Sequence, residues 1–460
     1  MKGPDYAEYL ESKKITTLSV GFNAIDINAM LFPFQKDIVK WALKKGRAAI
    51  FADCGLGKTP MQLEWANQVH KYTGGNVLIL APLAVSNQTA REGKKFGIEV
   101  NVCRNQSQVK PGINIANYEM LQHFDANFFT GIVLDESSIL KSYSGKIRTE
   151  IIEKFAKTPY KLACTATPAP NDFMELGNHT EFLGIMSRGE MLSMFFVHDG
   201  GETSKWRLKG HAESKYWEWV ASWAVVIRKP SDLGYDDGPF TLPELKLNQH
   251  TVLVDEPIEG HLFAIEAQTL QERQAARRTS IDDRVQKCAE LVNNSSEQWV
   301  VWCGLNNESS ALTKAINGAI EVKGSDSQEH KEKSIIVFIN GDLRVMVSKV
   351  SIFGFGMNMQ QCSNMAFVGL SDSYEAFYQA VRRCWRFGQD KPVNVHIITA
   401  ETEGAVVANI KRKELDSLRM IEEMVKHTQK ITQRNIKQSK KEITEYHPEQ
   451  EMVIPEWMTA

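Results

Sequence analysis

The strongest constraint on the fold is an alternation of short apolar runs with longer helical patterns. The runs are rich in Val, Ile and Leu, and each has the length of one buried strand. They form two groups, one between residues 48 and 168 and the other between residues 299 and 399. Because strands that alternate with helices build parallel sheets, the sequence predicts an α/β protein with two tandem domains.

The composition is that of a globular protein and excludes several classes. The chain has 460 residues, of which 43% are hydrophobic, so it is neither a small disulfide-bonded scaffold nor a disordered chain. Its 54 Lys and Arg against 56 Asp and Glu give a net charge of −2, which leaves room only for a local basic groove. The seven cysteines include no CxxC pair, and neither a signal peptide nor a long apolar run is visible. We therefore expect a soluble, cytoplasmic protein with reduced thiols and no membrane partner.

A nucleotide site is indicated by AIFADCGLGKT at residues 49–59, a strand followed by a glycine-rich turn. Gly55 and Gly57 let backbone N–H groups face phosphates at a helix N-terminus. The Lys58 ammonium can reach the β- and γ-phosphates, and the Thr59 hydroxyl can bind Mg²⁺. The alternative is a chance glycine turn. The pattern favours ATP and Mg²⁺ as cofactors.

An acidic pair, Asp135 and Glu136, ends a second apolar strand. Asp135 can hold the metal, and Glu136 can polarise the attacking water. On its own, such a pair is more often a solvated turn. Its position downstream of the glycine-rich turn favours the catalytic interpretation.

These two segments resemble motifs I and II of the superfamily-two helicases, with DESS in place of DEAD or DEAH. The resemblance implies that Gln35 reads the adenine edge. It also implies that Thr165 and Thr167, in the TATP segment, link hydrolysis to domain movement. The segments implied to contact the nucleic-acid backbone supply Pro82, Asn117 and Tyr118.

The second half narrows the resemblance to the Swi/Snf-like DNA translocases, whose signatures are a GxGxN segment and QAxxRxxRxGQ. Arg383 and Arg386 occupy the two arginine positions of the second signature and, three residues apart, share one face of a helix. Guanidinium groups stay charged and suit phosphate oxygens on which negative charge develops. The resemblance implies that Arg386 is the finger on the γ-phosphate, with Arg383 beside it. Further positions implied by the family are Gly354 and Gln379 for the nucleotide, and Lys349 and Asn358 for DNA.

The resemblance and the composition together divide the chain into six parts. They are an N-terminal segment (1–27), a RecA-like ATP-binding lobe (28–172), a helical insertion (173–228), a linker (229–250), a second RecA-like lobe (251–400) and a C-terminal helical extension (401–460). Four tryptophans in the insertion recur at near-helical spacing, which favours a small hydrophobic core over a base-stacking platform. They are Trp206, Trp217, Trp219 and Trp223.

The family resemblance implies a DNA-dependent ATPase that moves along double-stranded DNA, in repair, recombination or replication processing. The compact chain resembles bacterial or phage forms and leaves room for a nuclease or recombination partner protein. A basic stretch at residues 141–161 is either part of the DNA surface or a solvated helix. Two other functions stay open: a helicase that separates DNA or RNA strands, and an ATP-gated nucleic-acid clamp without motor activity.

Overall fold

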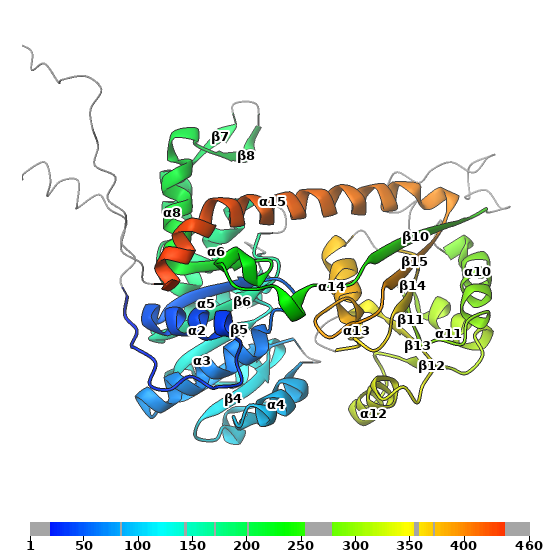
Figure 1. Ribbon diagram of the computed structural model, residues 1–460, viewed down its shortest axis with the longest axis horizontal. Coiled ribbons are helices and arrows are strands. Elements are labelled where there is room, and N and C mark those ends of the chain that lie inside the picture. The colour runs from blue at the N-terminus through cyan, green and yellow to red at the C-terminus, as the bar shows by residue number, and fades with distance from the viewer. Residues whose placement is uncertain are drawn as a thin grey trace, which may run out of the picture.

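Two parallel sheets flanked by helices make up the protein, and one long helix runs across both (Figure 1). The computed structural model describes residues 19–82, 85–141, 145–169, 172–199, 202–253, 278–353, 358–370 and 373–437. The two sheets confirm the predicted class, an α/β protein with two tandem RecA-like domains. We call them the first and second lobe.

The first sheet is buried on both faces. Its strands in the described part of the chain are β1 (Arg47–Ala52), β2 (Asn76–Ala81), β3 (Val100–Val102), β4 (Ile113–Asn117), β5 (Phe129–Asp135), β6 (Tyr160–Thr165) and β9 (Ala224–Ile227). They pair in the order β3-β4-β2-β5-β6-β1-β9, all parallel. Side chains alternate between two cores along each strand, so that Ile50 lies in one core and Phe51 in the other.

Helices cover both faces of the first sheet. They are α2 (Pro33–Lys45), α3 (Lys58–Thr73), α4 (Ser86–Lys95), α5 (Lys146–Lys154), α6 (Leu176–Leu183), α7 (Arg188–Phe195) and α8 (Glu213–Trp223). The helices α2 and α3 share one core, and α6, α7 and α8 share the other. Helix α2 begins at Pro33, whose fixed φ suits a first turn, and ends at Gly46, whose φ is 74°.

The second lobe repeats this design with a smaller sheet. Its described strands are β10 (Leu245–Val252), β11 (Trp299–Cys303), β12 (Ala319–Val322), β13 (Val345–Lys349), β14 (Asn364–Val368) and β15 (Val393–Ala400), in the order β10-β15-β14-β11-β13-β12. Its helices are α10 (Ile281–Asn293), α11 (Asn306–Ala315), α12 (Gln328–Ile339), α13 (Val350–Phe353) and α14 (Tyr374–Cys384). The carboxyl end of each parallel strand points to one edge of the sheet, where ligands bind in such folds.

The region between the lobes differs from the expected helical insertion and linker. An antiparallel hairpin of β7 (Phe196–Asp199) and β8 (Glu202–Leu208) stands beside α8, and β9 extends the first sheet by pairing with β1. Strand β10 begins inside the expected linker and pairs with β15. Pairing partners this distant in sequence leave no local signal. The tryptophans of α8 are buried in a core of the first lobe, as expected for hydrophobic core residues rather than for a base-stacking platform.

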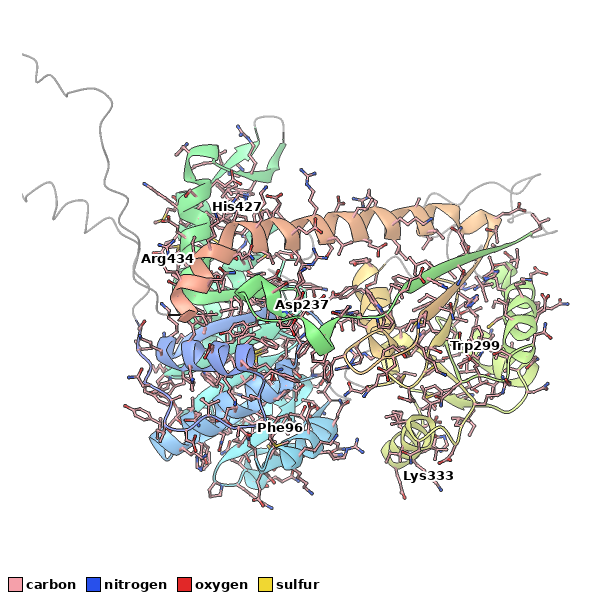
Figure 2. The ribbon with its side chains drawn as sticks, in the orientation of Figure 1. Phe96, Asp237, Trp299, Lys333, His427 and Arg434 are labelled. Carbon is pink, nitrogen blue, oxygen red and sulfur yellow. The ribbon has the colours of Figure 1, made fainter. Side chains whose placement is uncertain are left out.

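The long helix α15 (Gly404–Lys437) is anchored in both lobes. Val406 and Ile410 lie in a core of the second lobe, and Met424 lies in a core of the first. His427 lies on α15 (Figure 2), and its ring stacks on that of Trp217 of α8 with 5.3 Å between the ring centres. No helix in the described ranges combines the length and apolar character needed to cross a bilayer.

Candidate functional site

The glycine-rich turn after β1 has the conformation that phosphate binding requires. Gly55 and Gly57 have φ values of 89° and 77°, in the region that favours glycine. Gly57 also has no room for a side chain, because an added Cβ would lie 2.3 Å from Nε2 of Gln35. The ammonium of Lys58 donates to the carbonyl of Ala52 at 2.9 Å, so it folds back over the turn.

Gln35 is placed differently from the expected adenine contact. Its Nε2 donates to the carbonyl of Leu56 at 2.9 Å, and its Oε1 accepts from the N–H of Phe32 at 3.0 Å. The side chain is buried, with 3% of its surface exposed. Both ends of the amide are therefore engaged by backbone, and in this arrangement Gln35 supports the glycine-rich turn.

The acidic pair ends β5 directly beside this turn. Asp135 is buried, and its Oδ1 accepts from Nε2 of Gln62 at 2.8 Å. Glu136 has a φ of 54°, the one positive value at a non-glycine position in the described residues, which indicates local backbone strain. Burial raises the pKa of both carboxyls, while the nearby charge of Lys58 acts to lower each pKa.

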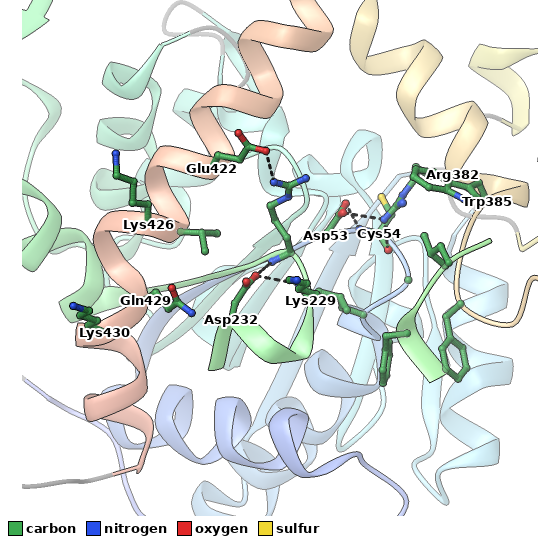
Figure 3. Close-up of a pocket in the computed structure, with 17 residues that line it drawn as sticks. Asp53, Cys54, Lys229, Asp232, Arg382, Trp385, Glu422, Lys426, Gln429 and Lys430 are labelled. Atoms are coloured by element: carbon green, nitrogen blue, oxygen red, sulfur yellow. Dashed lines mark hydrogen bonds and ion pairs between the residues drawn. The ribbon is translucent and has the colours of Figure 1, made fainter. Parts of the chain in front are cut away.

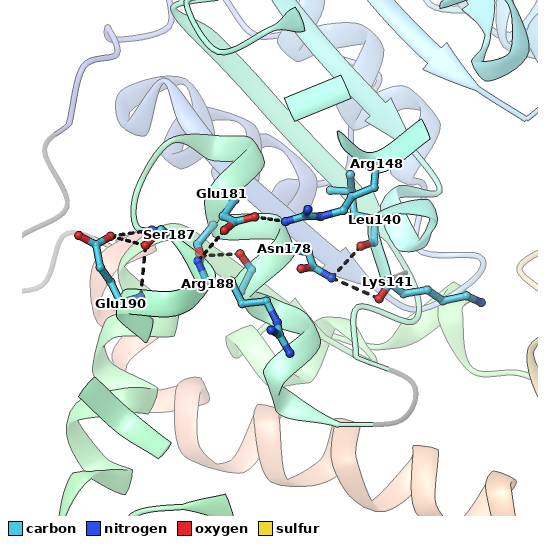
Figure 4. Close-up of polar contacts among 10 residues, drawn as sticks. Leu140, Lys141, Arg148, Asn178, Glu181, Ser187, Arg188 and Glu190 are labelled. Carbon is cyan, nitrogen blue, oxygen red and sulfur yellow. Dashed lines mark hydrogen bonds and ion pairs between the residues drawn. The ribbon is translucent and has the colours of Figure 1, made fainter. Parts of the chain in front are cut away.

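The turn that begins at Ser137 of DESS is held by α6, and Figure 4 shows Asn178 of that helix directed toward Leu140 of the turn. The hydroxyl of Ser137 lies 3.1 Å from Nε2 of His179, and burial lowers the pKa of that histidine to about 4. Nδ2 of Asn178 donates to the carbonyl of Leu140 at 2.8 Å. A buried neutral histidine and an amide thus fix the turn that follows the acidic pair.

The second lobe brings its arginines to the same place. Arg383 lies on α14 and donates from Nη2 to Oε1 of Gln379 at 3.2 Å. Arg386 lies two residues beyond the end of α14 at Cys384, so the two arginines do not lie on one helix as their spacing predicted. One cavity of about 90 Å³ joins these groups to the first lobe. Its lining includes Gly55, Gly57, Lys58, Thr59, Asp135 and Glu136 from the first lobe, with Asn358, Gln379, Arg382, Arg383 and Arg386 from the second.

The electrostatics of this cavity suit a polyanion. Burial lowers the pKa of Arg383, and burial together with Arg383 lowers the pKa of Arg386 to about 10. Like charges crowded in a buried site repel each other, so a bound anion would relieve the repulsion. With Lys58 and two carboxylates opposite them, the arginines form a set that can bind and hydrolyse a metal-complexed triphosphate.

The oxygen-bearing side chains in this cavity fit a Mg²⁺ ion that also binds water and phosphate oxygens. They do not form a site in which protein groups alone surround a metal. Within the described ranges no cluster of three His, Cys, Asp or Glu could hold a metal. Mg²⁺ commonly takes one or two protein oxygens and completes its shell with water and phosphate oxygens. Thr59 and Asp135 line the same cavity and supply such oxygens.

Comparisons with known proteins agree with this geometry. The helicase conserved C-terminal domain matches residues 283–388, from α10 through the turn that carries Arg386. The DNA annealing helicase and endonuclease ZRANB3 of Mus musculus is 21% identical over 420 residues, covering 81% of this chain and 39% of that protein. The Bos taurus protein of the same name is 22% identical over 428 residues, with the same coverage. The second lobe therefore matches the helicase conserved C-terminal domain family.

The chain spans about two fifths of the length of the curated relatives that it matches. Among solved structures, the SWI2/SNF2 ATPase core of Sulfolobus solfataricus in complex with dsDNA is 18% identical, with a TM-score of 0.43. That alignment covers 90% of this chain and 99% of the other.

Not all residues expected to contact DNA are exposed in this protein. Tyr118 is 4% exposed and donates its hydroxyl to the carbonyl of Asp135 at 2.7 Å, so it supports the acidic pair instead. Oδ1 of Asn117 accepts from the Ser86 hydroxyl at 2.7 Å. Asn358 lines the cavity that holds the glycine-rich turn.

The other expected DNA contacts stand at strand ends. Pro82 follows β2 and is half-buried. Lys349 ends β13 and lines a separate cavity of about 260 Å³ in the second lobe. Gly354 lies outside the described residues. In the basic stretch, Arg148 pairs with Glu181 (Figure 4). Lys161 donates to the carbonyl of Phe182 at 2.8 Å, so these two cations are engaged within the first lobe.

A second set of contacts between the lobes was not predicted from the sequence. Asp53 precedes the glycines of the turn, and Arg382 and Tyr378 on α14 both contact it. The spacing of Tyr378 and Arg382, four residues apart, signals one helical face. This spacing gives no information about the partner in the first lobe. Arg382 also donates to the carbonyl of Cys54, next to Asp53, and Cys54 is 328 residues away in sequence.

Proposed function

We propose that the protein hydrolyses ATP in the cavity between its lobes and uses the opening and closing of that cavity to move along double-stranded DNA. The observation that carries this proposal is the division of the catalytic groups. Lys58 and Glu136 belong to the first lobe, and Arg383 and Arg386 belong to the second. Hydrolysis would therefore require contact between the lobes, so each cycle of ATP turnover would change their relative position.

The roles follow from the chemistry of each group. Lys58 and the N–H groups of the glycine-rich turn would bind the phosphates, and Glu136 would orient and deprotonate the attacking water. Thr59 and Asp135 would hold Mg²⁺, which when bound neutralises charge on the phosphate oxygens. Arg386, with Arg383 beside it, would stabilise the charge that develops on the transferred phosphoryl group.

Duplex DNA is the proposed track. The curated relatives are named as DNA annealing helicases, and strand ends at the carboxyl edges of both sheets carry Pro82, Asn117 and Lys349. Short polar or basic groups at such edges suit contacts to DNA phosphates, which fix position without reading sequence. Thr165, next to Glu136, would link the state of the nucleotide to this edge. Repair, recombination and replication processing are the proposed settings.

The test is the ATPase rate with duplex DNA, single-stranded DNA and RNA measured in parallel. We expect duplex DNA to raise the rate most, and binding to weaken steeply as salt increases because phosphate contacts release counterions. A rate that no nucleic acid changes would contradict the proposal. The variant Glu136→Gln serves as the inactive control for contaminating ATPases.

Displacement assays distinguish movement from strand separation. A translocase removes the third strand of a triplex but leaves a forked duplex annealed, whereas a strand-separating helicase unwinds the fork. An ATP-gated clamp would bind DNA in an ATP-dependent way and would displace neither. We expect displacement of the third strand alone.

A further inference from the structure

A polar contact joins the lobes on the side of the glycine-rich turn that faces α15 (Figure 3). Nη2 of Arg382 lies 3.0 Å from Oδ2 of Asp53 and donates to the carbonyl of Cys54 at 2.6 Å. The hydroxyl of Tyr378 donates to Oδ1 of Asp53, which also accepts from the N–H of Cys54 at 2.7 Å. One carboxylate of the first lobe thus receives two side chains of α14.

Burial makes this contact stronger than an exposed ion pair. The side chain of Arg382 is 5% exposed and that of Asp53 is 21% exposed. The guanidinium lies 4.9 Å from the ring centre of Trp385 and 5.6 Å from that of Tyr378. Exposed ion pairs contribute little, whereas removal of one partner from a buried pair leaves an unpaired charge at high cost.

The same contact reaches the chain segment that connects the lobes. Trp385, which stacks on Arg382, donates from Nε1 to the carbonyl of Pro243 at 2.7 Å, two residues before β10. A continuous series of contacts therefore runs from Asp53 through Arg382 and Trp385 to the connection at Pro243. Movement of the lobes would strain or break this series.

Arg382 directly precedes Arg383 on α14, and Arg386 follows two residues after the end of that helix. Docking of Arg382 on Asp53 therefore fixes where the other two arginines stand relative to the phosphate-binding turn. The fit is close, since a Cβ added to Gly55 would lie 3.0 Å from the backbone N of Phe387 and 3.7 Å from Cβ of Arg386. A displacement of about 1 Å at such a site is enough to cost about a hundredfold in rate.

We propose that Arg382 is a positioning residue that docks the arginine-bearing end of α14 on Asp53 when the lobes close. This inference rests on the proposed ATPase function. The cavity of about 90 Å³ is smaller than the roughly 300–1,000 Å³ of typical ligand pockets, so the lobes would separate to admit a nucleotide. The pair between Asp53 and Arg382 would then break and reform in each turnover, and its loss would slow hydrolysis without weakening the initial binding of ATP.

The central experiment compares kcat and nucleotide Kd in Arg382→Ala and wild type, with a fluorescent ATP analogue for binding and duplex DNA present for turnover. We expect kcat to fall at least about tenfold while Kd changes less than about threefold. Arg382→Lys keeps the charge and should recover part of kcat, and Tyr378→Phe should lower kcat by about two- to threefold because it loses one hydrogen bond. The matched control is Arg412→Ala, which removes an arginine from the exposed pair with Asp416 and should change neither value.

A double-mutant cycle with Asp53→Asn tests the partner. If the two residues act through each other, the double variant should be little worse in kcat than Arg382→Ala alone, whereas additive losses would overturn the inference. Unchanged kcat in Arg382→Ala would also overturn it, and would leave the proposed function intact as long as wild type hydrolyses ATP. An inactive wild type would instead refute the proposed function. If Arg382→Ala fails to fold, unchanged kcat in both Arg382→Lys and Tyr378→Phe would overturn the inference.

Discussion

The hydroxyl of Thr165 lies 3.4 Å from Oε2 of Glu136 and also accepts from the N–H of Thr167 at 3.1 Å. The contact exists because β5 and β6 are parallel neighbours, so their carboxyl ends meet at one edge of the sheet. Glu136 also lies close to the charges of Lys58 and Arg383. The proposed catalytic carboxylate is therefore connected to both the nucleotide turn and the expected coupling segment.

Glu136→Gln should bind ATP and fail to hydrolyse it. The amide keeps the shape of the side chain but cannot accept a proton, so kcat should fall by about a hundredfold or more. Single-turnover hydrolysis and the Kd of a fluorescent ATP analogue measure the two effects separately. Glu119→Gln, at an exposed position in the same lobe, is the matched control. Wild-type turnover by Glu136→Gln would refute the assignment.

Thr165→Val should lower kcat by about tenfold and leave nucleotide affinity unchanged. Valine keeps the volume and branching of threonine but removes the donor to Glu136 and the acceptor for the Thr167 N–H. The DNA-stimulated part of the rate should fall more than the basal part, if this segment links hydrolysis to movement. Thr149→Val, on the exposed face of α5, controls for the substitution itself. Equal loss in both parts of the rate would argue against coupling.

Local sequence predicted which residues of the candidate site lie together in the first lobe. The glycine-rich turn and the acidic pair follow strands of the same parallel sheet, and the geometry of such sheets brings strand ends together. The spacing of Arg383 and Arg386 predicted that the two share one helical face, but α14 ends at Cys384 and Arg386 lies beyond it, although both line the same cavity. The turn and the acidic pair depend on periodicity and on backbone conformation, both of which are written in a few adjacent residues.

Side-chain partners that come from distant segments could not be predicted. Gln35 and Tyr118 have the residue types expected for ligand contacts, yet packing turns both toward backbone carbonyls. The pairing of β9 with β1 joins the first and the last strand of the first sheet in sequence order, which lie far apart along the chain. The sequence around Arg382 does not indicate its partner, because the contact with Asp53 depends on how the two lobes meet.

The pH dependence of kcat should have an acid limb above the ordinary Glu pKa of 4.5, because burial raises the pKa of Glu136. Activity needs the ionised carboxylate, so it should fall as the pH drops through this raised pKa. The positive charge of Arg383 lowers that pKa, so Arg383→Gln should move the acid limb to higher pH. The profile is measured at saturating ATP, with Arg412→Gln as the control. A shift to lower pH would contradict the assignment.

Arg386→Ala should retain ATP binding and lose DNA-stimulated hydrolysis. An arginine that acts only on developing charge stabilises the transition state more than the bound substrate, so kcat should fall on the order of a thousandfold with little change in Kd. Lys58→Ala should instead abolish binding or turnover, because Lys58 serves the bound phosphates throughout the cycle. Parallel measurement of kcat and Kd in the two variants separates these roles. Loss of binding in Arg386→Ala would contradict the finger assignment.

Arg284→Ala should destabilise the second lobe by about 3–5 kcal/mol, because it removes one partner from a fully buried ionic cluster. Nη1 of Arg284 donates to Oε1 of Glu308 at 2.7 Å, and its Nε lies 3.6 Å from Oε2 of Glu403, just before α15. All three side chains are 0% exposed, so the substitution leaves two carboxylates without their buried cation.

Urea unfolding followed by tryptophan fluorescence measures the change, since Trp299 and Trp302 lie in the cores of this lobe. Lys287→Ala breaks the exposed pair with Glu290 and should cost less than about 1 kcal/mol. An equal loss of stability in the two variants would show that the buried cluster does not anchor the N-terminal end of α15.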